Sequence, residues 1–449
     1  MFPKMEIRQC GDMQEPMELL ELPGISLDYC LRGLAGEAYQ DNAVFQELYS
    51  WYLQSPEYRI LVKKLTEASF SERPSDKIGK TVAKILYGEI SPYSATRLER
   101  FAACAFAHFL QYGLKVTERA EYEFRAMDMG NVMHMALEKF AAEVRKEGLD
   151  WAELTEEERN RIIDSCLDQV SADYGNTILK SSARNEYMIE RTRRILRRTV
   201  WALQEQLKHG AFRPEGFEVR FQGGRIDRVD IMEEPENNRV YVKVIDYKTG
   251  NTSFDLLALY HGLQLQLMVY LDGALQVEKR KYPDREIVPA GVFYYNVKDP
   301  MIQEKIHADM ESINEQMLKK MKMNGLVQAD DNMSTKIDST MASIPVSLNR
   351  DGSFSKRSSV ASRKQFDALG AYVRRKICDI RESILDGNAA VEPYELGKKN
   401  ACTYCPYLTV CGFDRKIPGY EFHRLSSIEE DALWKKIMKG EEENGSEMD

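Results

Sequence analysis

The chain lacks any hydrophobic run approaching the roughly 20 apolar residues that a membrane-spanning helix needs. Its N-terminal stretch, MFPKMEIRQCGDMQEPMELL, lacks the basic and then apolar pattern of a secretory signal. These two absences predict a cytoplasmic protein. In the cytoplasm, its eight cysteines are expected to be free, catalytic or metal-bound rather than paired in disulfides.

Positive charge is also in short supply. The chain has 62 Lys and Arg against 71 Asp and Glu, a net charge of −9, which on its face argues against a nucleic-acid partner. Two local features run the other way: an arginine-rich stretch at 180–200 and two lysines shortly before Cys402. They can provide a basic track for phosphates, although a solvated helix face explains the arginine-rich stretch equally well.

With 449 residues the chain has room for about two to three domains. We expect a helical segment over 1–80, a main domain over 86–427 and a frayed acidic tail over 428–449. In the main domain, helical periodicity up to residue 209 gives way to alternating strand patterns, which predicts an α/β fold. The expected elements are helices from 91, from Gly130 and over 152–209, strands in EVRFQGGRIDRVDI and RVYVKVIDYKTG, a helix at 254–275, a strand at 288–297, a loop at 327–342, and a helix capped by Ser362 and Gln365.

The strongest chemical signal lies in the two predicted strands between residues 224 and 248. In IDYKTG, Asp246 and Lys248 are two positions apart on a strand, so their side chains project from the same face. In GRIDRVD, Asp227 is expected at the end of the preceding strand, which a short turn makes the antiparallel neighbour. Two carboxylates beside a lysine can hold Mg²⁺ and support hydrolysis of a phosphodiester. The alternative for Asp246 and Lys248 is a surface ion pair worth under about 1 kcal/mol.

Three further polar residues lie on predicted helices. His134 lies one turn into the helix after Gly130, and Gln266 and Tyr270 lie four apart on the helix after IDYKTG. Taken singly, a solvated histidine and a half-buried helix face explain them. Their order along the chain gives them a second interpretation.

Four motifs, G-x-x-x-H, G-x-I-D, I-D-Y-K-T-G and Q-x-x-x-Y, occur in an order that resembles RecB-type nucleases of the PD-(D/E)XK superfamily. The resemblance implies a restriction-endonuclease-like fold, a central mixed sheet flanked by helices. The residue roles it implies are Mg²⁺ ligation by His134, Asp227, Asp246 and the backbone carbonyl of Tyr247, catalysis by Lys248, and contact with DNA or support of the site by Gln266 and Tyr270.

Cys402, Cys405 and Cys411 form a C-x₂-C-x₅-C pattern. Three cysteines this close predict ligation of zinc or an iron–sulfur cluster, each of which takes four ligands, and a chance grouping of structural thiols is the alternative. Here the resemblance narrows to the AddB-type component of AddAB helicase–nucleases, in which an earlier cysteine completes a [4Fe–4S] site. It implies Cys104 as the fourth ligand and a cluster that staples the ends of the domain, although Ala105 stands where the family usually has proline.

The resemblance covers residues 86–414, whereas AddB-type proteins carry a helicase-like portion of many hundreds of residues before this region. Residues 1–80 match only its last piece. The implied function is a Mg²⁺-dependent DNA exonuclease acting at DNA ends, beside an ATP-driven AddA-type partner in double-strand-break repair and recombination. Two alternatives stay open: a stand-alone RecB-like nuclease of the CRISPR-adaptation type, and a non-catalytic DNA-end-binding iron–sulfur module.

Overall fold

The chain divides into two compact units, Met1–Ser75 and Asp76–Asp449. None of the described helices is both long and apolar enough to cross a bilayer. A computed structural model describes residues 23–34, 43–69, 77–88, 95–119, 126–174, 182–222, 224–302, 310–417 and 419–445.

The first unit is helical over its described residues. Its helices are α1 (Pro23–Leu34), α2 (Ala43–Gln54) and α3 (Arg59–Ser69). They enclose a small apolar cluster of Leu27, Cys30, Tyr52 and Val62. The helical N-terminal segment expected from the sequence is therefore present over 23–34 and 43–69, and the rest of 1–75 lies outside the described residues.

The second unit is built on a mixed sheet with the strand order β1-β2-β3-β4-β5-β6. Strands β1 to β3 pair antiparallel, β3 and β4 pair parallel, β4 and β5 antiparallel, and β5 and β6 parallel. The mixed sheet expected from the sequence is thus confirmed. The strands are β1 (Arg213–Phe221), β2 (Gly224–Glu234), β3 (Arg239–Lys248), β4 (Glu286–Asn296), β5 (Asn324–Gln328) and β6 (Val360–Ala361).

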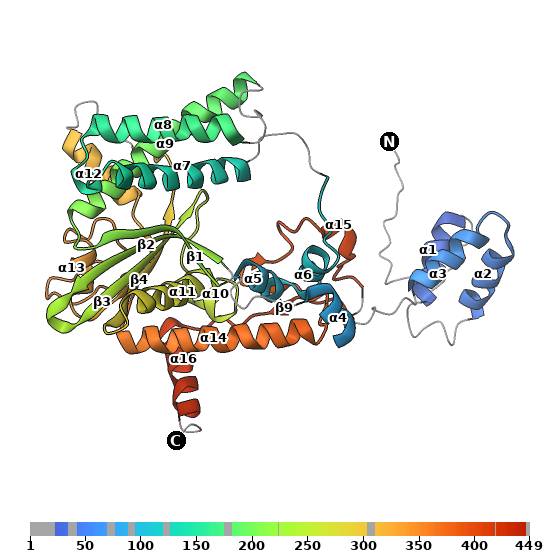
Figure 1. Ribbon diagram of the computed structural model, residues 1–449. Helices are drawn as coiled ribbons and strands as arrows, with labels where there is room; N and C mark the ends of the chain where they lie inside the picture. The colour runs from blue at the N-terminus through green and yellow to red at the C-terminus, as the bar shows by residue number, and fades with distance from the viewer. Residues whose placement is uncertain are drawn as a thin grey trace. The chain divides into compact units, whose positions relative to one another are not determined.

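Helices cover both faces of this sheet (Figure 1). On one face lie α7 (Ala126–Lys146), α8 (Glu156–Asp173) and α9 (Ala183–Lys208). On the other face lie α11 (Gln266–Lys281) and α14 (Arg363–Leu385). Because both faces are covered, the central strand β3 is apolar on both sides, and alternate residues enter separate cores.

The remaining elements are short or peripheral. A second small sheet has the order β8-β7-β9. The elements are α4 (Lys80–Tyr87), α5 (Ala95–Ala103), α6 (Ala105–His108), a π-helical turn (Phe109–Gly113), 3₁₀ turns at Trp151–Glu153 and Pro235–Asn237, α10 (Leu256–Tyr260), α12 (Met310–Lys320), α13 (Met333–Ile337), β7 (Tyr394–Leu396), β8 (Lys399–Asn400), α15 (Leu408–Cys411), β9 (His423–Arg424) and α16 (Glu430–Gly445).

Several local predictions need correction. EVRFQGGRIDRVDI is a hairpin of β1 and β2 rather than one strand, and a Cβ on Gly224 would lie only 2.7 Å from the Phe221 ring. The helix expected at 254–275 is two helices, α10 and α11, broken where Gly262 adopts a φ of +81°. The polar stretch 327–342 contains the end of β5 and helix α13 rather than loop alone. Helix α7 begins at Ala126, before Gly130.

The C-terminal region also differs from its prediction. The capping box of Ser362 and Gln365 is present at the start of α14. The frayed end expected after residue 428 is wrong for the first part of α16, because Leu433, Trp434 and Ile437 are buried in the core beneath the sheet. Three apolar residues at helical spacing outweigh the acidic composition of this stretch.

Candidate functional site

The two predicted carboxylates meet where β2 begins and β3 ends. Arg228 and Ile245 are paired in the antiparallel register, so Asp227 and Asp246 come one position beyond that pair. Asp227 thus lies near the start of β2 and not at a strand end as predicted. Its Oδ2 accepts a 2.8 Å hydrogen bond from the backbone N–H of Tyr247. The hairpin places the side chain that the single-strand prediction had left at the wrong end.

Helix α7 brings His134 to the same place. The Nδ1 atom of His134 lies 3.4 Å from Asp227 Oδ2. One turn earlier, a Cβ on Gly130 would lie 3.3 Å from the Thr249 hydroxyl, so the absence of a side chain lets the helix approach the end of β3. This is the physical reason for the G-x-x-x-H spacing.

Lys248 is held between a carboxylate and an amide. Its Nζ lies 2.7 Å from Asp246 Oδ2 and donates a 2.7 Å hydrogen bond to Gln266 Oε1. The Nε2 of Gln266 in turn donates to the Tyr270 hydroxyl at 2.8 Å. The structure therefore joins Lys248, Gln266 and Tyr270 in one hydrogen-bonded line that leads away from Asp246.

These side chains line one cavity of about 770 Å³. We call His134, Asp227, Asp246 and Lys248 the acidic site. The other residues that line the cavity are Gly130, Asn131, Met135, Glu138, Tyr174, Glu218, Arg225, Tyr247, Thr249, Gln266 and Tyr270. All the predicted metal-binding and catalytic residues are thus brought together.

Burial without full charge compensation marks the acidic site. Burial raises the pKa of Asp227 to about 6, and burial together with the Asp227 charge raises the pKa of Asp246 to about 7. Burial lowers the pKa of His134, which favours the neutral imidazole that can ligate a metal. Carboxylate oxygens and an imidazole nitrogen with unmet demand for positive charge fit a divalent cation.

Glu218 is a residue of this site that the sequence did not reveal. It comes from β1, its side chain is 8% exposed, and it forms an ion pair with Arg225. Oxygen or nitrogen atoms of His134, Glu218 and Asp227 all lie within 4.8 Å of one another. Its only signal was a strand irregularity: the register shifts between Pro214 and Gly216, and Glu218 has a left-handed φ of 51°.

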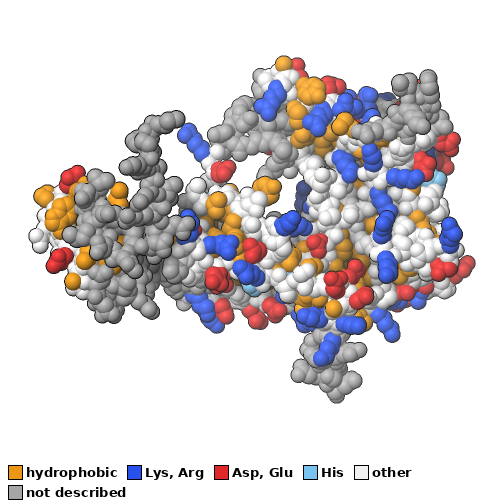
Figure 2. Space-filling model, turned by 180° about the vertical axis from the view of Figure 1, so that it is seen from behind, with side chains coloured by type: hydrophobic (Ala, Val, Ile, Leu, Met, Phe, Trp, Pro, Cys, Tyr) orange, Lys and Arg blue, Asp and Glu red, His pale blue; other side chains and the backbone are white. Residues whose placement is uncertain are grey.

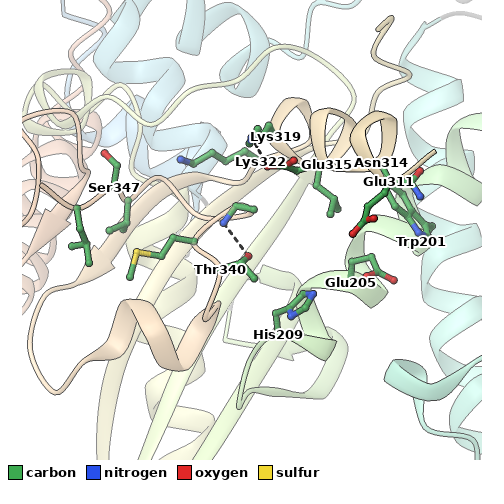
Figure 3. A pocket seen from close by; sticks show the side chains of 15 residues that line it. Trp201, Glu205, His209, Glu311, Asn314, Glu315, Lys319, Lys322, Thr340 and Ser347 are labelled. Carbon is green, nitrogen blue, oxygen red and sulfur yellow. Dashed lines mark hydrogen bonds and ion pairs between the residues drawn. The ribbon is translucent and has the colours of Figure 1, made fainter. Parts of the chain in front are cut away.

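A larger cavity, of about 1210 Å³, lies elsewhere, between α9, α12 and residues 340–348 (Figure 3). Glu205 and His209 line it from α9, and Glu311 and Lys319 line it from α12. These side chains are spread around the opening in Figure 3 and do not converge. Within the described part of the chain, its histidine and carboxylates form no group close enough to hold a metal, so we assign the chemistry to the smaller cavity.

The four predicted cysteines also come together. Cys104 directly follows α5, whereas the other three lie about 300 residues later, around α15 (Figure 1). Burial and then the charges of the other three cysteines raise the pKa of Cys402 to about 11, which requires the four sulfurs to share one neighbourhood. Between the two segments, Tyr407 packs against Ala107, and its hydroxyl donates a 2.9 Å hydrogen bond to the Val116 carbonyl.

Four converging thiols fit a thiolate-ligated cluster in their chemistry. The backbone N–H groups of Phe106 and Ala107 point to the Cys104 sulfur, the type of hydrogen bond that stabilises cluster-bound thiolates. Cys30 and Cys166 are buried in other cores, and Cys378 is exposed. Cys10 lies outside the described residues.

The arginine-rich stretch forms ion pairs rather than a free basic track. Most of its arginines on α9 reach carboxylates on α8 or beyond β4. The pairs are Arg193 with Asp164 and Asp168, Arg197 with Asp164, and Arg194 and Arg198 with Asp299. On the face in Figure 2, Lys and Arg side chains are scattered and not gathered in one continuous stripe. These observations favour the ion-paired helix face.

Comparisons with known proteins give a consistent result. A family model described as the PD-(D/E)XK nuclease superfamily matches residues 92–412. The chain is 38% identical to an ATP-dependent helicase/deoxyribonuclease subunit of the AddB type from Lachnoclostridium phytofermentans, over 98% of this chain and 40% of the relative. Proteins with the same description in Alkaliphilus metalliredigens and Clostridium acetobutylicum are 33% and 32% identical, over 98% and 90% of the chain. The chain spans about 40% of the length of these curated relatives.

Proposed function

The chain belongs to the PD-(D/E)XK nuclease superfamily, and we propose that it is a Mg²⁺-dependent deoxyribonuclease that hydrolyses phosphodiester bonds at DNA ends. The observation that carries the proposal is the convergence of Asp227, Asp246 and Lys248 in one polar cavity. The relatives' description as an ATP-dependent helicase/deoxyribonuclease supports DNA as the substrate and an ATP-driven AddA-type protein as the partner, in double-strand-break repair. A DNA substrate and free thiols agree with a cytoplasmic location.

The acidic site supplies the metal ligands in this proposal. His134, Asp227 and Asp246 would hold Mg²⁺ together with the backbone carbonyl of Tyr247, and Glu218 is close enough to take part. When bound, Mg²⁺ lowers the pKa of a water and stabilises negative charge on a phosphoryl oxygen. The carboxylates are suited to hold it because burial leaves them short of positive charge.

Lys248 is the proposed catalytic lysine. Its ammonium group stands beside Asp246 and lines the cavity, where it can orient a water or a phosphoryl oxygen. Gln266 fixes the direction of the ammonium group, and Tyr270 fixes the amide of Gln266. These hydrogen bonds favour support of the site as the role of Gln266 and Tyr270, over direct contact with DNA.

The four cysteines are proposed to hold a [4Fe–4S] cluster that joins Cys104 to the segment of Cys402, Cys405 and Cys411. Anaerobic purification with iron and sulfide analysis tests this, and a protein that contains only zinc would refute it. Such a cluster ties two distant segments and therefore contributes to folding. We expect Cys405→Ser to abolish cooperative thermal unfolding of the second unit, and Cys378→Ser, at an exposed thiol, to leave it unchanged.

The two alternative functions find less support. The helicase/deoxyribonuclease relatives match 98% of the chain and thus also residues before the nuclease match, which a minimal stand-alone nuclease of the CRISPR-adaptation type does not explain. A non-catalytic DNA-end-binding module does not explain why His134, Asp227, Asp246 and Lys248 retain their mutual contacts.

A nuclease assay on the purified chain tests the proposal. The substrates are end-labelled duplex and single-stranded DNA, with Mg²⁺ or with EDTA. We expect Mg²⁺-dependent cleavage that Asp246→Ala or Lys248→Ala abolishes while thermal unfolding stays cooperative. Glu186→Gln, at an exposed position on α9, is the matched loss of one negative charge and should cleave normally. Tight DNA binding without cleavage by the wild-type chain would instead favour the non-catalytic module.

A further inference from the structure

Helix α11 begins without a capping side chain of its own. The residue before it, Leu265, has no side-chain acceptor for the free backbone N–H groups of the first turn. Glu99, on helix α5, takes this role from a distance of 166 residues in sequence. A single carboxylate oxygen, Oε1, accepts hydrogen bonds from the N–H of Leu265 at 2.6 Å and of Gln266 at 2.9 Å.

This capping carboxylate lies directly behind the proposed catalytic lysine. Glu99 does not line the cavity, so it is not placed to touch substrate. Gln266, whose backbone Glu99 holds, is the same residue whose side-chain oxygen accepts from Lys248 Nζ at 2.7 Å. Its amide nitrogen also anchors to Tyr270. The side chain of Gln266 can direct Lys248 only as precisely as its backbone is fixed.

The helix that carries Glu99 is itself firmly placed. Leu98 is fully buried and Phe101 is 9% exposed, both in the core beneath the sheet. Helix α5 ends at Ala103, one residue before Cys104. A group that holds Cys104 therefore also holds the end of the helix that presents Glu99.

We propose that Glu99 is a positioning residue that sets Lys248 through the first turn of α11 and Gln266. This inference rests on the proposed function for its effect on cleavage, but the capping itself does not. The carboxylate also favours the positive end of the helix dipole, so both the hydrogen bonds and the charge act on the same turn. Glu99 thus links the cysteine end of α5 to the acidic site.

The experiment compares Glu99→Met, which removes the acceptor, with Glu99→Gln, which keeps an oxygen in place. Glu186→Met on α9 is the control for loss of an exposed carboxylate. Three quantities are measured on the full chain: kcat and KM for cleavage of labelled DNA, Mg²⁺ affinity by calorimetry, and hydrogen exchange of peptides that cover residues 262–272. We expect Glu99→Met to lower kcat by about 10–100-fold, to leave Mg²⁺ affinity within about twofold, and to speed exchange in the first turn of α11. Glu99→Gln should stay within about threefold of the wild-type kcat.

A double-mutant cycle separates positioning from general damage. If Glu99 acts through Gln266, then Glu99→Met together with Gln266→Met should cleave no more slowly than Gln266→Met alone. Multiplied losses, or a parallel loss of Mg²⁺ affinity, would overturn the inference. Should Glu99→Met not fold, Glu99→Asp withdraws the carboxylate by about 1.5 Å and full activity of that variant would overturn it.

The exchange measurement keeps this inference distinct from the proposed function. If the wild-type chain does not cleave DNA with Mg²⁺, the proposed function fails, yet faster exchange at 262–272 in Glu99→Met still supports the capping role. If the wild-type chain cleaves and exchange in Glu99→Met equals that of the wild type, Glu99 does not position α11 and the inference fails alone.

Discussion

Strands β2 and β3 carry two groups of charged residues with opposite character. At one end lies the acidic site, with Asp227, Asp246 and Lys248. A few residues along lies a second group, Arg228, Asp230 and Lys243, which we call the ionic cluster. Both groups are built from the same two motifs, GRIDRVD and KVIDYK, so sequence proximity does not tell them apart.

The ionic cluster is closed and fully compensated. Arg228 donates to both Asp230 oxygens, at 2.6 and 3.0 Å, and Lys243 Nζ lies 2.9 Å from Oδ2. Asp230 is completely buried. Although burial opposes its ionisation, the charges of Arg228 and Lys243 hold its pKa below the usual range. The guanidinium is also 5.2 Å from the Trp151 ring centroid, which leaves the cluster no room for a further ligand.

The acidic site has the opposite balance and a cavity in front of it. Its carboxylates outnumber its ammonium group, and their pKa values are raised instead of lowered. The comparison teaches that two cations around one buried carboxylate make a structural element, whereas buried carboxylates in excess make a site that gains from a cation.

The largest expected effect exchanges the readouts of the two groups, beginning with Asp246→Asn. This change removes one negative metal ligand but keeps the size of the side chain. We expect cleavage with Mg²⁺ to fall by about 10³-fold, equivalent to about 4 kcal/mol of transition-state stabilisation. Cooperative unfolding monitored by circular dichroism should persist. Cleavage within about tenfold of wild type would remove Asp246 from the catalytic machinery.

Asp230→Asn should give the reverse result. It leaves Arg228 and Lys243 buried with no carboxylate between them, which costs about 3–5 kcal/mol of unfolding free energy. Urea unfolding measures this loss. Below the unfolding transition, cleavage per folded molecule should stay within about twofold of wild type. A folded Asp230→Asn protein that is as stable as wild type but inactive would show that the ionic cluster belongs to the site.

The sequence predicted the residues of the acidic site better than their placement. Order and spacing of the motifs found His134, Asp227, Asp246 and Lys248, because chemistry restricts those residue types. It did not find that β1 and β2 form a hairpin, since the turn depends on close packing of Gly224 against Phe221. The same error placed Asp227 at the wrong end of its strand.

Residues that act through tertiary contacts escaped sequence reasoning altogether. Glu218 and Glu99 have no motif of their own, and their roles come from partners on other elements. The ionic cluster was missed for the same reason, since Arg228 and Asp230 alternate with apolar residues as on any exposed strand. The cysteines were easier to find, because closely spaced thiols in a reducing compartment are typical of metal or cluster ligands.

A smaller effect tests whether Glu218 extends the acidic site. We expect Glu218→Gln to weaken Mg²⁺ binding by about tenfold, because it removes a carboxylate near His134 and Asp227. Arg225→Gln should strengthen binding, since it frees Glu218 from its ion pair. Calorimetric titration of both variants measures the two directions, with Glu186→Gln as control. Equal affinities in all four proteins would assign Glu218 to strand structure alone.

The smallest effect is the pH dependence of the metal-free chain, in which the two groups should have opposite signs. Burial raises the pKa of Asp246 from 3.8 to about 7, so the folded state holds protons that the unfolded state releases, and stability falls as pH rises from about 4 to 7. Asp246→Asn removes this penalty, and in EDTA at pH 8 it should melt about 2–4 °C above wild type, a difference that shrinks toward pH 4. The lowered pKa of Asp230 instead stabilises the fold above about pH 4, so Asp230→Asn should melt below wild type at pH 8. If both variants shift the melting temperature in the same direction at pH 8, the contrast in charge compensation between the two groups is wrong.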